Sequence, residues 1–184
     1  MRADFKVVLD ACVLANYGVA NLLLSLAEKP RLYLPVWSEE ILTETRRTQV
    51  GRFRWEERIA DSFQAQLRSV FPESLIYGFD HLIGECTNDA KDRHVLACAI
   101  HSKAEVILTF NLRDFPSESL SRWGITAKHP QEYLLMLFRL EPLQMMHHLG
   151  IGAGKRGRSL EDHLIDIGRF VPAFSANVLE ELES

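Results

Sequence analysis

The sequence predicts an α/β fold of three layers, α/β/α, in which helices cover both faces of a central parallel sheet, with further helices at the C-terminus. Short apolar runs at residues 6–9 and 106–108 have the length and β-branched content of buried strands. Longer segments between such runs have the periodicity of helices. Strands that alternate with helices along a chain are typical of a parallel sheet, because each crossover connection needs a helix.

Length and composition fit a globular protein. The 184 residues suit one domain with a short appendage, and a hydrophobic fraction of 47% supports a buried core. A net charge of −4 argues against a uniformly basic nucleic-acid-binding surface, although it allows a local basic patch. The chain starts without the apolar segment of a signal peptide, and residues 20–27 are too few to cross a membrane, so we expect a cytoplasmic protein without membrane contact.

Cysteine and histidine patterns exclude two kinds of site. Three cysteines without a CxxC pair indicate free thiols of a reducing compartment, and no HExxH pattern supports a zinc protease.

The N-terminal half alternates strands and helices. After the first strand, residues 13–27 have the pattern of a helix, and residues 32–36 form a weaker strand because Pro35 interrupts them. Ser38 is a suitable N-cap for a helix that runs to about residue 51. Apolar residues then recur every four positions between residues 53 and 71, which predicts an amphipathic helix that Pro72 ends.

The C-terminal half continues the alternation and then changes character. We expect a helix at residues 94–103, a strand at 125–127 and a helix at 131–140. Four glycines among three basic residues then suggest a flexible basic loop: Gly150, Gly152, Gly154, Lys155, Arg156, Gly157 and Arg158. Two amphipathic helices are expected after it, at residues 160–170 and 173–182.

Acidic residues stand at the ends of these elements. Asp10 ends the first strand and Asp114 follows the strand at residues 106–108, so both belong at the carboxyl edge of the sheet, where ligands bind in such folds. Asp92 and Glu44 each lie beside an apolar helical stripe. Four acids from separate segments are therefore expected to converge: Asp10, Glu44, Asp92 and Asp114.

Such a cluster needs a positive partner. Crowded carboxylates resist ionisation, and a hard cation such as Mg²⁺ relieves the repulsion while it retains water and binds phosphate. A bound metal ion lowers the pKa of a water molecule and neutralises charge on a phosphodiester. Each acid alone also fits a plainer role: Asp92 an N-cap, Glu44 an ion pair with Arg47, Asp114 a turn. The joint pattern, rather than any one residue, carries the hypothesis of a metal site.

Four segments resemble, in order and spacing, the motifs of PIN-domain ribonucleases, most closely the VapC-like toxins. They are VVLDACVL at residues 7–14, SEEILTE at 38–44, DAKDRHVLACA at 89–99 and ILTFNLRDFP at 107–116. The resemblance implies a PIN-like nuclease domain over residues 1–140, followed by a helical extension over residues 141–184. It also implies an endoribonuclease (a hydrolase of RNA) that uses Mg²⁺ or Mn²⁺.

The resemblance also assigns roles to individual residues. Asp10, Glu44 and Asp92 correspond to the family's core acids, which would be both catalytic and metal-binding. Asp114 takes the fourth position, with Asn111 as the other residue that matches it. The family's bacterial members further imply a homodimer, and an antitoxin protein as the partner of a type II toxin–antitoxin pair.

Further residues are expected to support the site or bind RNA. Thr109 follows the strand and is placed to hydrogen-bond a phosphate or a water molecule, and Asp89 is a candidate outer acid. Arginine side chains are suited to phosphate contacts, although a solvated helix face is the alternative for this run: Arg46, Arg47 and Arg52. His94 is expected on the helix surface.

Other functions fit the sequence less well. A haloacid-dehalogenase-like phosphatase needs a second Asp where Cys12 stands, and a receiver domain needs an acidic pair at the first strand. The stronger alternative is a catalytically inactive PIN-like domain that only binds other proteins, and metal-dependent melting would separate it from an enzyme.

Overall fold

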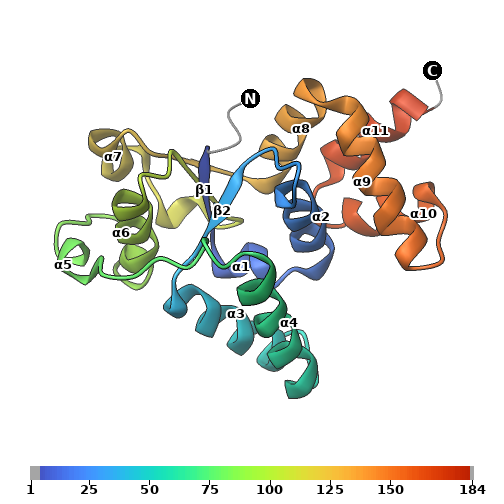
Figure 1. Ribbon diagram of the computed structural model, residues 1–184. Helices are drawn as coiled ribbons and strands as arrows, with labels where there is room; N and C mark the ends of the chain where they lie inside the picture. Colours follow the sequence, from blue (N-terminus) through green and yellow to red (C-terminus); the bar gives the residue numbers. More distant parts are fainter. Residues whose placement is uncertain (1–4, 183–184) are drawn as a thin grey trace.

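The computed structural model describes residues 5–182 and contains a four-stranded parallel sheet with helices on both sides (Figure 1). The strands are β1 (Lys6–Leu9), β2 (Leu34–Val36), β3 (Val106–Leu108) and β4 (Thr126–Lys128). Their spatial order is β2-β1-β3-β4, and all neighbours are parallel. The predicted α/β class and parallel sheet are confirmed.

The helices follow the predicted order with a few differences. They are α1 (Ala11–Leu14), α2 (Tyr17–Ala27), α3 (Glu39–Gly51), α4 (Glu57–Val70), α5 (Asp80–Ile83), α6 (Arg93–Ser102), α7 (Ser117–Leu120), α8 (Pro130–Leu140), α9 (Pro142–Lys155), α10 (Leu160–Gly168) and α11 (Pro172–Leu182). Three short 3₁₀ turns lie at Ala90–Asp92, Leu112–Asp114 and Ser121–Trp123. The predicted helix over residues 13–27 is divided in two, because the Asn16 side chain accepts a hydrogen bond from the Val19 N–H and caps α2.

The central strands and the helices around them share one core. Val7, Val8 and Ile107 are fully buried, as expected for strands covered on both faces. Helix α6 packs against β1 and β3, and α2 packs against β2. The Cα pairing places Leu9 opposite Leu108, so the chain leaves β1 and β3 at the same edge of the sheet.

The C-terminal helices pack onto the sheet domain. Helix α9 contacts α2, α8 and α10, and α11 contacts α8 and α10 (Figure 1). Their buried side chains, among them Met145, Leu164 and Phe174, join the same hydrophobic core as the sheet. The boundary at residue 140 stays a prediction.

The prediction of a flexible basic loop around residues 150–158 is wrong, because helix α9 continues through this segment to Lys155. Each glycine in a helix interior costs about 1 kcal/mol relative to alanine. The packing of the buried residues Met145, Leu149 and Ala153 against the rest of the protein offsets this cost in α9. Gly157 ends the helix in the left-handed conformation, with φ 62°, and the next N–H donates to the Ala153 carbonyl. This is a Schellman C-cap, which glycine at that position favours.

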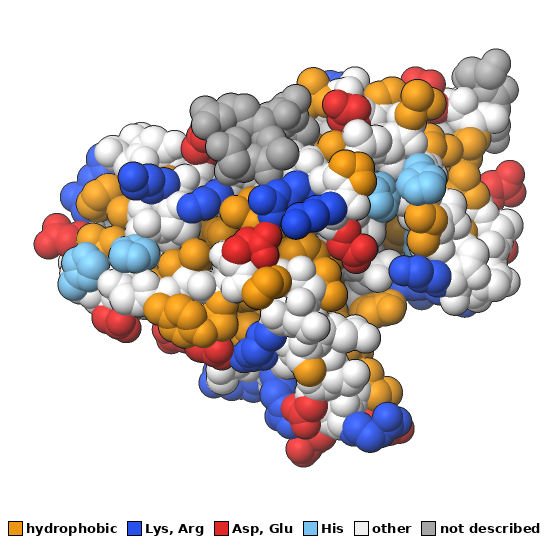
Figure 2. All heavy atoms as spheres, viewed as in Figure 1, with side chains coloured by type: hydrophobic (Ala, Val, Ile, Leu, Met, Phe, Trp, Pro, Cys, Tyr) orange, Lys and Arg blue, Asp and Glu red, His pale blue; other side chains and the backbone are white. Residues whose placement is uncertain are grey.

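Charged side chains are mixed on the surface. Figure 2 shows both acidic and basic groups on the face in view. The three cysteines are free thiols, as predicted, with Cys86 and Cys98 buried and Cys12 half-buried. Among the described residues, no helix combines the length and the apolar character that a membrane span requires.

Candidate active site

Asp10 stands where β1 ends and α1 begins, and three donors hold its carboxylate. Oδ1 accepts from the Ala11 N–H at 2.6 Å, while Oδ2 accepts from the Thr109 hydroxyl at 2.7 Å and from the Cys12 thiol at 3.1 Å. Burial raises the pKa of Asp10, and these three hydrogen bonds act in the opposite direction. Thr109 comes directly after β3, so the two central strands together fix this carboxylate.

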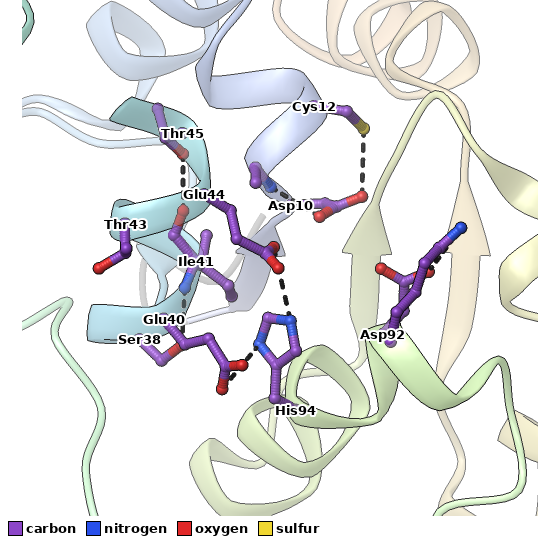
Figure 3. Close-up of polar contacts among 12 residues, drawn as sticks. Asp10, Cys12, Ser38, Glu40, Ile41, Thr43, Glu44, Thr45, Asp92 and His94 are labelled. Atoms are coloured by element: carbon purple, nitrogen blue, oxygen red, sulfur yellow. Dashed lines mark hydrogen bonds and ion pairs between the residues drawn. The ribbon is translucent and has the colours of Figure 1, made fainter. Parts of the chain in front are cut away.

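Glu44 projects from α3 toward the same edge of the sheet. Its carboxylate lies 3.5 Å from Nε2 of His94, and the Glu40 carboxylate lies 3.6 Å from Nδ1 of the same ring. Figure 3 shows the His94 ring on α6 between these two glutamates of α3. Burial alone would lower the pKa of His94, but the close carboxylates of Glu44 and Glu40 outweigh it and raise the pKa. His94 therefore orients Glu44 across the contact between α3 and α6.

Asp92 and Asp114 form a second pair of acids beside Asp10. Burial, a hydrogen bond with Asp114 and the charge of Asp10 raise the pKa of Asp92 to about 7. The Lys91 ammonium lies 2.8 Å from the Asp114 carboxylate and lowers the pKa of Asp114. The Asn111 amide also donates to Asp114. The two neighbouring acids therefore have pKa values shifted in opposite directions, upward for Asp92 and downward for Asp114.

One cavity of about 310 Å³ connects most of these groups. Its lining residues are Asp10, Ala11, Cys12, Glu44, Arg47, Thr48, Arg52, Phe53, Lys91, Asp92 and Asn111. Three of the four predicted core acids therefore share one cavity. Asp114 lies next to it, joined through Asn111 and Lys91.

The remaining predicted residues differ in their positions. Thr109 lies behind Asp10, fully buried, and Asp89 is exposed, where its carboxylate caps the 3₁₀ turn by accepting from the Lys91 N–H. Arg47 and Arg52 line the cavity. Arg46 points to α4 instead, where it pairs with Asp61 at 2.6 Å and with Glu57 at 3.3 Å.

The donor set suits a hard divalent cation. Asp10, Glu44 and Asp92 supply carboxylate oxygens to one cavity, and Asn111 adds an amide oxygen. Burial raises the pKa of both Asp10 and Asp92, with a neighbouring acid as a further cause, and a bound cation would favour the ionised form of each carboxyl group. The Lys91 ammonium lies closer to the Asp114 carboxylate, at 2.8 Å, than to the Asp92 carboxylate, at 3.8 Å, so it offsets the charge of Asp92 less.

Sequence reasoning missed several residues of this site. The expectation that His94 lies on the surface is wrong, since only 4% of its side chain is exposed. The signal was present: residues 95–99 are all apolar, so this helix is buried on several sides and His94 with it. Glu40 and Lys91 were also missed, because Glu40 approaches His94 and Lys91 approaches Asp114, each from a distant segment.

Comparisons with known proteins show the family of this chain. Residues 4–113 match the PIN domain family. A segment of 59 residues is 48% identical to a protein of Mycobacterium tuberculosis (strain ATCC 25618 / H37Rv) named "Putative ribonuclease VapC50". That alignment covers 32% of this chain and 35% of the relative, so the chain spans about a third of the length of the curated relative it matches. No solved structure matches the chain. Since the family match covers more than half of the residues, the chain belongs to the PIN domain family.

Proposed function

We propose that this protein is a metal-dependent endoribonuclease that hydrolyses RNA phosphodiester bonds with Mg²⁺ or Mn²⁺. The observation that carries the proposal is the cavity in which acids from three separate segments meet: Asp10, Glu44 and Asp92. Membership of the PIN domain family and the likeness to a protein named as a ribonuclease support it. The site offers carboxylates for a cation, while burial raises the pKa of the nearby Cys12 thiol and makes it a poor nucleophile.

Each residue of the site has a distinct task in this proposal. The cation would be held by Asp10, Glu44, Asp92 and Asp114, and when bound it lowers the pKa of a water molecule and offsets charge on the phosphate. Thr109 and the Ala11 N–H keep Asp10 in one orientation. His94 does the same for Glu44.

Basic residues at the cavity would bind the substrate. Arg47, Arg52 and Lys91 line it, and in this proposal they bind the phosphates on either side of the cleaved bond. The ion pairs of Arg46 with α4 leave it a structural role in this proposal.

Cleavage of a mixed RNA pool tests the enzyme and its site together. We expect cutting by the wild-type chain with Mn²⁺, none with EDTA and none by Asp92→Asn, because the loss of one carboxylate weakens the cation site. Asp80→Asn, an exposed change on α5, is the matched control and retains activity. Cleavage that persists in EDTA or in Asp92→Asn would contradict the assignment.

We further propose that the protein is a cytoplasmic toxin of a type II toxin–antitoxin pair, acts as a homodimer and is inhibited by an antitoxin protein. The resemblance of its four motifs to VapC-like toxins supports this. Expression of the wild-type chain should arrest growth, while Asp92→Asn should not, and a neighbouring small open reading frame should suppress the arrest. Equal growth of both strains would argue against a toxin.

A further inference from the structure

Phe53 is an exposed aromatic residue in the same cavity as the carboxylates. Its side chain is 38% exposed and lines the cavity together with Asp10 and Glu44. The Arg52 guanidinium lies 5.7 Å from the centre of its ring. Among the described residues, Phe53 is not part of the hydrophobic core that joins the sheet and helices, so core packing does not explain its position.

The turn between α3 and α4 holds Phe53 in place. The Thr48 carbonyl accepts from the N–H groups of Arg52 and Phe53, at 2.9 and 3.1 Å, and the Gln49 carbonyl accepts from the N–H of Trp55 at 3.0 Å. Trp55 turns inward, with its ring centroid 6.0 Å from that of Phe63. The two aromatic residues of this turn therefore have different environments, one packed against the core and the other at the cavity.

The backbone of this turn is strained. Arg54 has a φ of 58°, in the left-handed region that long side chains rarely adopt. Such strain persists only where the surrounding hydrogen bonds impose it, and it concentrates at functional sites. Arg54 thus lies between Trp55, which packs against the core, and Phe53, which lines the cavity.

The chemistry of nucleic acids indicates what an aromatic ring in this cavity can bind. A phosphodiester held at the carboxylates brings its neighbouring bases to the cavity rim. An unpaired base stacks on an aromatic ring, and an arginine beside the ring adds to the attraction, whereas the bases of a duplex are already stacked within the helix. Single exposed apolar residues are common, but Phe53 lines the same cavity as the acids and as two arginines, Arg47 and Arg52.

We propose that Phe53 forms a subsite for one unpaired nucleobase next to the phosphodiester that is cleaved. Arg52 flanks the base and binds the adjoining phosphate. This inference rests on the proposed ribonuclease function and adds to it a determinant for single-stranded RNA.

RNA binding measured by fluorescence anisotropy tests the subsite. The probe is a single-stranded 12-nucleotide RNA of mixed sequence, bound in an Asp92→Asn background with Mn²⁺ so that it stays intact. We expect Phe53→Ala to weaken binding by about 5- to 100-fold and Phe53→Trp to keep it within about threefold, because tryptophan retains a stacking surface. Tyr77→Ala, which removes a 62% exposed aromatic outside the cavity, is the control and leaves binding unchanged.

A spectroscopic readout separates stacking from a loss of structure. A 2-aminopurine base placed in the RNA strand should lose fluorescence when the strand binds the Asp92→Asn parent, which retains Phe53. The loss should be much smaller when the strand binds the variant that also carries Phe53→Ala. Binding of a duplex of the same sequence should be equal for both proteins. If Phe53→Ala binds the single strand as tightly as its parent, or weakens single strand and duplex alike, the subsite is refuted.

The cleavage assay distinguishes failure of the Phe53 subsite from failure of the proposed ribonuclease activity. Wild-type cleavage that is unaffected by Phe53→Ala, together with unchanged binding, refutes the subsite and leaves the ribonuclease. If the wild-type chain neither binds nor cuts RNA with Mn²⁺, the ribonuclease proposal fails and the subsite fails with it.

Discussion

At the scale of single residues, the orientation of Asp10 depends on a hydroxyl group from the neighbouring strand. Thr109 donates to its carboxylate at 2.7 Å and accepts from the Asn111 N–H at 3.0 Å. It thereby links two residues of the proposed site. Partners that orient metal-binding side chains are typically needed for full affinity and activity.

Replacing Thr109 by Val removes this hydroxyl with almost no change in volume. We expect Mn²⁺ affinity and RNA cleavage to fall by roughly 10- to 100-fold, because Asp10 loses one of its donors. Isothermal titration with Mn²⁺ measures the effect. Thr126→Val on the edge strand β4 is the matched control, and equal affinities for the two variants would show that the hydroxyl does not act through Asp10.

His163 shows how burial makes stability depend on pH. It lies buried on α10, and burial together with the charge of Arg156 lowers its pKa below the ordinary value of 6.5. The unfolded chain therefore takes up the proton first as the pH falls. The contribution of the neutral, buried His163 to the free energy of unfolding is complete above about pH 6.5. It is lost as the pH falls below that value, with a slope of at most about 1.4 kcal/mol per pH unit.

Urea unfolding at pH 7.5 and pH 5.5 checks this sign. The free energy of unfolding of the wild-type chain should fall more between these pH values than that of His163→Leu, which has no proton to gain. His101→Leu, a change at an exposed histidine of α6, should behave like the wild type. An equal fall for wild type and His163→Leu would contradict the argument.

At the scale of elements, α9 and α10 approach closely at one glycine. A Cβ atom added at Gly152 would lie 2.8 Å from Nε2 of His163, whereas one added at Gly154 would meet nothing within 4 Å. The same glycines that made a loop look probable from sequence thus include one that helix packing requires. A sequence alone does not distinguish a glycine that breaks a helix from one that lets another helix approach.

Gly152→Ala should destabilise the protein by about 1–3 kcal/mol, because the His163 ring must move to accept the methyl group. Gly154→Ala is the control, and we expect it to be neutral or stabilising by up to about 1 kcal/mol, since alanine favours the helix. Urea unfolding measures both. A fall in stability that is equal for the two variants would show that intrinsic helix propensity, rather than contact with α10, sets the result.

The packing of α3 against its neighbours was also beyond prediction from sequence. Arg46 pairs with Asp61 and Glu57 of α4, and Glu40 approaches His94 of α6. Periodicity identifies which residues lie on one face of a helix, but it does not identify the element that this face meets. Arg46, a candidate for phosphate contacts, thus also links α3 to α4, and its contact with RNA stays a prediction.

At the scale of the whole molecule, the sheet explains why much of the site was predictable. Parallel strands end at one edge, and here the Asp10 N–H donates to the Leu108 carbonyl at 3.0 Å. Residues that follow β1 and β3 must therefore meet, whatever the details of packing. Alternation of apolar runs and amphipathic segments sufficed to predict the parallel sheet and the helices α8, α10 and α11, but not α9 or the short helices α5 and α7.

The central claim is that these carboxylates form one cation site. Calorimetric titration of the wild-type chain with Mn²⁺ tests it most directly, with Asp92→Asn and the control Asp80→Asn measured beside it. The account predicts saturable binding by the wild type and by Asp80→Asn, and binding at least tenfold weaker in Asp92→Asn. The same low affinity in all three proteins would contradict a cation site and favour a PIN-like domain that acts only by binding other proteins.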